Sequence, residues 1–331
     1  MRKTMKSISV DPFLELIDPF KKQVQKTFFA KGIILGLICF MLLLALVGLI
    51  FTVDAVVAIS LASIMLLVFL FYVTRLYLKE SLFQKALEVK NKIEEKAKKE
   101  SMEADERAEL FSRLALATHY LPVNLVHTSF FPKFFEKFLN RVLTFITWTP
   151  LHTLGEVFFL ASGDEHIQQI KKDPTNLPLH AHLANLYVML SHHYLEPIKA
   201  KPFLPWPGIF LTSSARATLE LKAEISSKNA LEELNILQAF APDELWVHDQ
   251  LAISYKELKM PEKEIEECEA ILRLCPDDHQ ACLRLGILYF SQGKNAKGLE
   301  LYEQLRQVQP LLAEELIEHY GAYQPSLKGI Y

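Results

Sequence analysis

The stretch LRLGILYFSQGK, residues 283–294, places two glycines within and just after an apolar helical pattern. Gly286 lies three residues before Tyr289, and Gly293 follows four residues after that tyrosine. A glycine inside a helix costs about 1 kcal/mol relative to alanine, so a close contact is expected to compensate for it. We expect Gly286 to lie where this helix crosses a second helix of the same unit so closely that only a small residue fits. Gly293 is expected to end the helix and allow a tight turn.

A regular period of about 34 residues, a length typical of stacked helical units, extends outward from this stretch. Pro242, Pro276 and Pro310 are evenly spaced, Pro174 lies two periods before Pro242, and the missing member would fall at Gly208. A small residue, and in three cases a tyrosine three positions later, recurs in the same register: Ala184 and Tyr187, Thr218, Ala252 and Tyr255, Gly286 and Tyr289. This period predicts an all-α solenoid.

Two adjacent units, 245–278 and 279–312, repeat residue size at many positions. The matching residues are Leu251, Ala252, Tyr255, Ile265, Cys268, Leu272 and Pro276, followed by Leu285, Gly286, Tyr289, Gly293, Gly298, Leu299, Tyr302 and Pro310. This pattern resembles the tetratricopeptide repeat (TPR). Among these residues, Ala252, Tyr255, Gly286, Tyr289 and Gly298 are expected to pack the helices of each unit together.

The resemblance is less complete toward the N-terminus. Unit 211–244 matches at fewer positions, and unit 177–210 has a matching first helix followed by a proline-rich segment, which we expect to be extended. The run 154–174 is interpreted as a shortened unit out of frame. Residues 311–324 are expected to form a polar-backed helix that closes the stack, because open-ended stacks need a cap.

The resemblance implies a binding surface on the concave side of the stack. Family members usually bind peptides or partner proteins there, and the positions carried over are Trp246, Asp249, Ile253, Lys256, Gln280, Leu283, Ile287 and Phe290. Members that clamp a C-terminal carboxylate have lysine and asparagine where this chain has Asp249, Ile253, Leu283 and Ile287. We therefore expect an apolar groove with an acidic rim, which suits an amphipathic helix or an apolar peptide. The alternative is that several of these residues pack against the neighbouring unit.

The apolar segment near the N-terminus predicts membrane insertion. Between residues 32 and 73 the only charged residue is Asp54. A single helix of this length would measure about 63 Å, roughly twice the hydrocarbon thickness of a bilayer. Two spans, 32–51 and 55–74, with Asp54 at the tip between them, fit better. Lysine and arginine flank both outer ends and not the tip, which places both termini in the cytoplasm: Lys21, Lys22, Lys26, Lys31, Arg75, Lys79 and Lys85.

The segments on either side of this hairpin have different compositions. Residues 1–31 form a basic cytoplasmic N-terminus, 32–74 the transmembrane hairpin, and 75–120 a charged helical stalk with one helix expected over 76–118. Residues 121–176 hold amphipathic and degenerate repeat helices, 177–312 the TPR-like repeats, and 313–331 a capping helix and tail. The phenylalanine-rich basic helix at 130–146 either lies on the membrane surface or packs in a protein core.

Charge and cysteine content restrict the function classes. Residues 224–331 carry 19 acidic and 10 basic residues, which argues against nucleic-acid binding there. The four cysteines form no C-x-x-C pair, as expected for reduced thiols that face a cytoplasm. His180 and His182 are two residues apart and point in different directions on a helix, and no zinc-protease motif occurs. We predict no catalytic residues, no cofactor and no metal.

The leading hypothesis is a membrane-anchored TPR adaptor or scaffold, in its simplest form in a bacterial inner membrane, that binds a protein or peptide partner on the cytoplasmic side. Two alternatives remain open. The hairpin is similar to the bilobed hydrophobic hairpin of chlamydial inclusion-membrane proteins, which implies a secreted effector in a host-derived vacuole membrane. The third hypothesis is an enzyme that uses the histidine-rich region 152–193.

Overall fold

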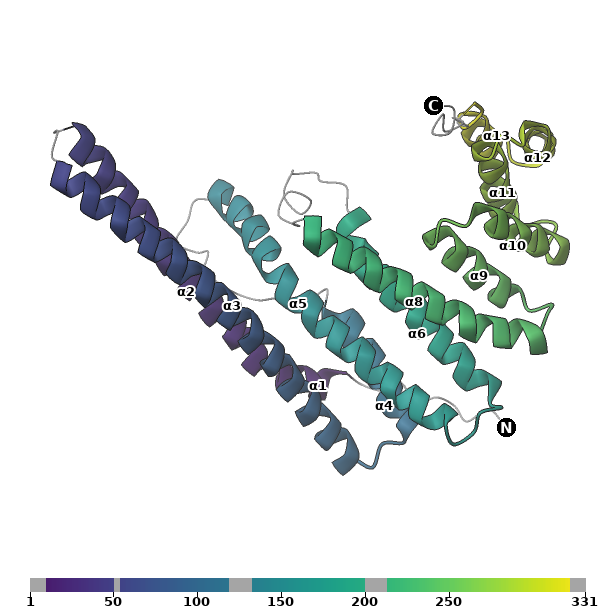
Figure 1. Ribbon diagram of the computed structural model, residues 1–331. Coiled ribbons are helices and arrows are strands. Elements are labelled where there is room, and N and C mark those ends of the chain that lie inside the picture. Colours follow the sequence, from purple (N-terminus) through teal and green to yellow (C-terminus); the bar gives the residue numbers. More distant parts are fainter. Residues whose placement is uncertain (1–9, 51–53, 119–132, 200–212, 322–331) are drawn as a thin grey trace, which may run out of the picture. The chain divides into compact units, whose positions relative to one another are not determined.

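The computed structural model describes residues 10–50, 54–118, 133–199 and 213–321, with the side chains of 133–148 left aside (Figure 1). Every regular element in these ranges is a helix, and no strand occurs among them, so the all-α prediction is confirmed. The chain divides into two compact units, Met1–His166 and Ile167–Tyr331. Each unit has its own helices and packing and is described by itself.

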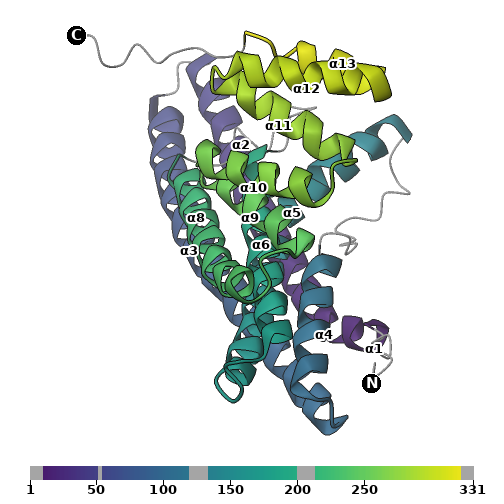
Figure 2. The same cartoon turned by 90° about the vertical axis from the view of Figure 1, so that its right-hand side faces the viewer.

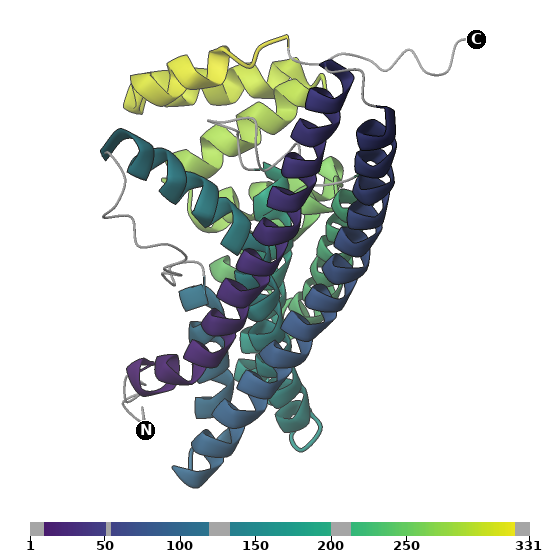
Figure 3. The same ribbon diagram turned by 90° about the vertical axis from the view of Figure 1, so that its left-hand side faces the viewer.

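Two long helices dominate the first unit. α2 (Asp18–Ile50) and α3 (Asp54–Lys99) lie side by side and antiparallel, and the short α1 (Asp11–Leu14) and a 3₁₀ turn (Glu15–Ile17) precede them (Figure 3). Asp54 is the first residue of α3, so it stands at the tip as expected. Both helices are long and apolar enough to cross a membrane.

The outward faces of these helices differ from those of soluble core helices. Only 11% of the most apolar window of the first helix and 6% of that of the second are buried. The side chains of Leu43, Leu49, Leu66 and Phe69 are each more than 60% exposed. Small residues occupy the interface: Ala45 and Ser60 are buried, and a Cβ at Gly48 would lie 3.1 Å from the side chains of Val56 and Val57. Close packing by small residues is the usual arrangement between membrane helices.

Residues 10–31 are helical rather than a tail. Phe13, Ile17, Phe20 and Val24 are buried, and the periodic apolar positions of the expected stalk are buried as well: Leu78, Leu82, Ala86, Val89 and Ile93. Gln23 donates a hydrogen bond to Ser81 (2.9 Å), and Lys96 donates one to the Pro12 carbonyl (2.8 Å). The stalk is therefore not a separate solvated rod, because its apolar face packs on the helices before the hairpin.

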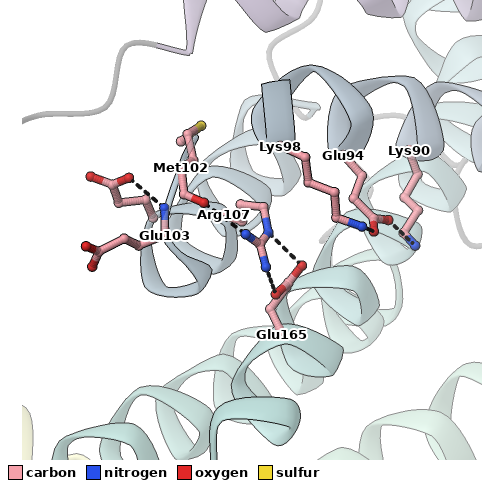
Figure 4. Close-up of polar contacts among 8 residues, drawn as sticks. Lys90, Glu94, Lys98, Met102, Glu103, Arg107 and Glu165 are labelled. Carbon is pink, nitrogen blue, oxygen red and sulfur yellow. Dashed lines mark hydrogen bonds and ion pairs between the residues drawn. The ribbon is translucent and has the colours of Figure 1, made fainter. Parts of the chain in front are cut away.

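The single helix expected over 76–118 is interrupted. α3 ends at Lys99, Ser101 has a left-handed φ of 57°, and α4 (Ala104–Ala117) begins with a capping box between Glu103 and Glu106. Figure 4 shows Arg107 at this bend, where it donates to the Met102 carbonyl (2.9 Å) and, with two nitrogens, to Glu165 of α5 (3.0 and 2.8 Å). None of the side chains of residues 100–103 is buried.

α5 (Lys133–Ile170) is one helix of 38 residues that contains Pro150. The run 154–174, expected to form a shortened repeat unit, supplies the C-terminal half of this helix and a turn instead. Leu154 and Phe158 are buried, Phe158 lies 6.2 Å from Phe111 of α4 between ring centroids, and Ser162 donates to the Ala108 carbonyl (2.7 Å). The side chains of 133–148 and residues 130–132 lie outside the described part, so the amphipathic face there stays a prediction.

The second unit is a succession of antiparallel helices (Figure 2). These are α6 (Leu177–Lys199), α8 (Ser213–Phe240), α9 (Leu245–Glu257), α10 (Pro261–Leu274), α11 (His279–Ser291), α12 (Asn295–Val308) and α13 (Pro310–Ile317). Proline starts α10 and α13, where its missing N–H has no partner to lose. Asp278 accepts hydrogen bonds from the amides of Gln280 and Ala281 and so caps α11.

Candidate functional site: the repeated helical pairs and an inserted arm

The period of the sequence is also the period of the helix ends. α9 and α10 begin at Leu245 and Pro261, and α11 and α12 begin one period later, at His279 and Asn295. The turns repeat too: Lys259 and Gly293 both have positive φ, 57° and 70°. The amide of Met260 bonds to the Tyr255 carbonyl, and the amide of Lys294 bonds to the Tyr289 carbonyl, both at 2.9 Å. This is a helix-ending Schellman-type turn, present twice.

The preceding pair, α6 and α8, begins and ends in the same register as α9 and α10 but has a longer segment between its two helices. α6 begins at Leu177, which is two periods before the start of α9, whereas α8 ends at Phe240, which is one period before the end of α10. In this helical pair, the parts of α6 and α8 that match α9 and α10 are therefore separated by one extra period of sequence. When α9, its turn and α10 are aligned with this pair, the residues left without a counterpart are 193–226. We call this segment the inserted arm.

The inserted arm explains the incomplete match in units 177–210 and 211–244. Residues 211–244 do not form a helical pair, because 213–240 contain no glycine or proline and run as one helix. The first helix of one expected unit pairs with the second half of the other. Ala184 and Val188 of α6 share a core with Ala230, Leu234 and Leu237 of α8. Residues 200–212, which hold most of the proline-rich segment 197–210, lie outside the described part; Lys199 and Pro197 still belong to α6.

The residues expected to pack the repeats are buried, but their partners differ from the expectation. A Cβ at Gly286 would lie 2.7 Å from the methyl groups of Leu316, so the close approach is to α13 rather than to the second helix of the same unit. Gly298 fills that second role: a Cβ there would lie 2.4 Å from the ring of Phe290. Ala252, Tyr255 and Tyr289 are buried. Thr218 is exposed, because it belongs to the inserted arm.

Two of the expected groove residues are buried. Leu283 and Phe290 lie in the core that α11 shares with α12 and α13, and the half-buried Ile287 packs against it. Trp246 and Ile253 pack, also half-buried, on the core shared by α6, α8 and α9. Leu283 and Phe290 are covered because the helices that follow α11 use its apolar face.

The exposed members of the predicted set are polar. Lys256 and Gln280 are exposed, and Asp249 is half-exposed with one oxygen 3.7 Å from Arg284. Arg284 also donates to Glu264 at 2.9 Å, so it connects α11 to α10. These residues form a polar strip of mixed charge on α9 and α11, and the apolar groove with an acidic rim stays a prediction.

A buried carboxylate holds the base of the inserted arm. Glu257, the last residue of α9, accepts hydrogen bonds from Ser227 (2.9 Å) and Ser191, and His192 lies 3.0 Å from its other oxygen. Burial raises the pKa of Glu257, but the bonds from His192, Ser191 and Ser227 outweigh this, so the pKa is lowered overall. Ser191 and Ser227 stand at the two ends of the arm, and Glu257 connects both to the next helical pair.

Two histidines make the same pair of contacts in successive helical pairs. His180 lies 2.5 Å from Glu233 through Nδ1 and 3.0 Å from the Pro174 carbonyl through Nε2. His248 lies 2.7 Å from Glu267 and 2.8 Å from the Pro242 carbonyl through the same two atoms. We call each arrangement a His–Glu clip. Sequence reasoning missed the clips, although Pro174 with His180 and Pro242 with His248 share a six-residue spacing within the period.

The histidines and cysteines of the described residues form no cluster of metal ligands. Within the part of the chain that the structure describes, no group of three or more His, Cys, Asp or Glu residues is placed to hold a metal ion. Burial raises the pKa of Cys268 to about 11, so its thiol stays protonated and unreactive near neutral pH. His180 contributes to a His–Glu clip.

Fold and site together define an all-helical chain with two membrane-length apolar helices and a set of repeated helical pairs. No protein-family model matches this chain, and no curated protein matches it.

Proposed function

We propose that this protein is a membrane-anchored scaffold that uses its repeated helical pairs to hold a protein partner near the bilayer. The observation that carries the proposal is the composition of α2 and α3, which expose large apolar side chains along 32–50 and 55–73. Leaving that surface in water would be unfavourable by about 25 cal/mol for each Å². A bilayer covers it, and anchoring raises the local concentration of any partner without a further contact.

The flanking charges support a position with both ends in the cytoplasm. Lysines and an arginine occur outside both ends of the hairpin, and the tip has none. A protease-protection experiment on inside-out and right-side-out vesicles tests this sidedness with an epitope tag at each end. Both tags should be digested from the same side, and digestion from opposite sides would contradict a two-span topology.

The polar strip on α9 and α11 is the partner surface that the geometry supports best. Its exposed residues are Lys256, Gln280 and, in part, Asp249, beside Arg284. A strip with both charge signs suits a polar peptide or loop of the partner, with specificity from paired charges rather than from apolar burial. The amphipathic or apolar ligand that the sequence predicts is the alternative to this polar partner.

Affinity capture with the full chain in detergent or nanodiscs tests the strip. Lys256→Glu combined with Gln280→Arg alters exposed side chains only, so helical content should stay unchanged while capture of the main partner falls at least tenfold. The matched control is Glu262→Arg with Glu266→Arg, which changes two exposed charges on α10. Equal capture by the wild type and the first variant would remove the strip as the binding surface and leave the membrane anchor untouched.

A further inference from the structure

Each His–Glu clip requires two N–H groups on one imidazole ring. The Pro174 and Pro242 carbonyl oxygens accept hydrogen bonds and cannot donate, so Nε2 of His180 and of His248 must carry hydrogen. An ionised carboxylate also only accepts, so Nδ1 must carry hydrogen as well. A neutral imidazole has a single N–H and leaves one of these two contacts as two facing lone pairs.

We propose that each His–Glu clip keeps one proton above neutral pH, where a histidine and a glutamate that are not in contact have lost it. The first two helical pairs therefore loosen as pH rises. An imidazole binds a proton more tightly than a carboxylate does, so the proton resides on the ring. This inference concerns the stability of the stack and does not depend on the proposed function.

The surroundings of His180 are consistent with a charged ring. The side chain is buried, and Glu233 of α8 is the charged group that faces it, while the nearby Asp173 bonds to Thr175 and Asn176. Burial lowers the pKa of His180, but the bonds to Glu233 and to the Pro174 carbonyl outweigh it, and the pKa is raised from 6.5.

The surroundings of His248 have the same character. Glu267 of α10 faces the ring, and the cation Arg284 bonds to Glu264 and lies near Asp249. Tyr255 on the same helix is buried, and its phenol stays neutral because burial, followed by the charges of Glu267 and Glu266, raises its pKa. The clip on α9 therefore keeps one acidic partner, as the clip on α6 does.

The sign of the pH effect follows from the raised pKa of His180. A histidine whose folded pKa lies above the unfolded value stabilises the fold fully below the unfolded value, about 6.5. That contribution is lost as pH rises through the folded pKa. Within this window each extra bound proton changes the unfolding equilibrium constant about tenfold for each pH unit.

The third helical pair serves as an internal control. Cys282 stands one period after His248, and Leu301 stands one period after Glu267. Cys282 belongs to the apolar core of α11, and Leu301 packs against that core, so this pair has no clip. The pH dependence should therefore reside in α6, α8, α9 and α10 and be absent from α11 and α12.

Replacing the carboxylate with an amide separates proton uptake from hydrogen bonding. In Glu233→Gln and Glu267→Gln the new NH₂ group can donate to Nδ1 of a neutral ring that still donates from Nε2. The double variant should keep its fold but lose most of the fall in thermal midpoint between about pH 6 and pH 9. The matched control is Glu232→Gln with Glu266→Gln, two exposed neighbours, which should keep the wild-type slope.

Circular dichroism of the full chain in detergent micelles measures these midpoints, and ¹⁵N NMR of histidine-labelled wild type reads the ring directly. His180→Gln and His248→Gln variants assign the two signals. The proposal expects the rings of the two clips to keep both N–H groups to a higher pH in the folded chain than in the chain unfolded in urea. Equal pH slopes in the wild type and the double glutamine variant would overturn it. Loss of the second N–H at the same pH in the folded and the unfolded chain would overturn it as well, and this result decides the matter even if the variant fails to fold.

Discussion

Two helical pairs of the second unit share the same arrangement but differ in sequence length. One is α9 with α10, and the other is α6 with the second half of α8. In α9–α10 a three-residue turn joins the two helices. In the other pair the inserted arm lengthens both helices and adds one full period of sequence between their matching parts. The comparison shows that a helical pair keeps its core when residues are added at the turn, because that end of the pair faces away from the core.

If the two pairs are equivalent, the same core substitution should have the same large effect in both. Leu251 and Leu183 stand at matching positions two periods apart and are almost fully buried. We expect Leu251→Ala and Leu183→Ala each to lower the free energy of unfolding by about 2–5 kcal/mol, since each leaves a cavity. Chemical denaturation of the full chain in micelles measures both. A negligible effect at Leu183 alone would show that the pair with the arm is not a repeat of α9–α10.

The glycines of the regular part give a second, smaller contrast. Gly298→Ala would press a methyl group against the buried ring of Phe290, whereas Gly286→Ala meets the flexible methyl ends of Leu316. Overpacking costs about 1–3 kcal/mol, and removing a helical glycine returns up to about 1 kcal/mol. Gly298→Ala should therefore destabilise by about 1–2 kcal/mol and Gly286→Ala by less. Equal thermal midpoints of the two variants would contradict this order.

Glu257 distinguishes the two pairs, because only the pair with the arm uses it at its base. The lowered pKa means that its stabilisation is present above the unfolded value of about 4.5 and is lost as pH falls through the lower folded pKa. Glu257→Gln weakens charge-assisted hydrogen bonds and should cost about 1.5–3 kcal/mol at pH 7. The cost should shrink in acid, as measured by urea unfolding at several pH values.

Glu262→Gln is the control for this experiment, because that side chain is exposed on α10. It should change stability by less than about 0.5 kcal/mol at every pH. An effect of Glu257→Gln that stays constant into acid would mean that the glutamate acts through packing rather than through its charge.

Removing the arm should have the smallest effect. Deleting 193–226 joins His192 to Ser227, keeps the residues that bond to Glu257 and restores a unit of the regular length. The shortened chain should stay folded, with a thermal midpoint within a few degrees of the wild type, because the core of α6, α8 and α9 retains its residues. A shortened chain that no longer melts cooperatively would show that the arm is part of the core.

The two pairs share the His–Glu clip although only one of them carries the inserted arm. His180 and His248 occupy the same place in the pair with the arm and in α9–α10, so the clip does not depend on the arm. A variant without the arm should therefore keep both clips and the alkaline loss of stability.

Several features of the fold follow from local sequence. The apolar run 32–73 dictates two long helices because backbone groups in an apolar medium must be paired within the segment. The position of Asp54 predicts where the run turns, and the bounds of α2 and α3 agree with it. The helices and turns of 245–308 were predictable too, since two adjacent copies carry the same residues at the same spacing.

The partners of individual residues were less predictable. A small residue at 286 indicates a close neighbour but not which helix supplies it, and Leu316 of α13 does so here. The groove residues follow from an alignment of positions, but burial depends on the helices that follow, and these cover Leu283 and Phe290. The His–Glu clips join residues 53 and 19 positions apart, so the six-residue spacing of proline and histidine does not show which glutamate completes each clip.

The sequence by itself determined the helical class, the apolar hairpin with basic flanks and the repeat period, because each depends on local composition or on spacing along one chain. The tertiary structure decided that two incomplete units form a single helical pair, that residues 10–31 pack along the base of α3, and that buried histidines connect helices through carboxylates. These features depend on which segments, distant in sequence, come into contact, and local sequence patterns do not specify those contacts.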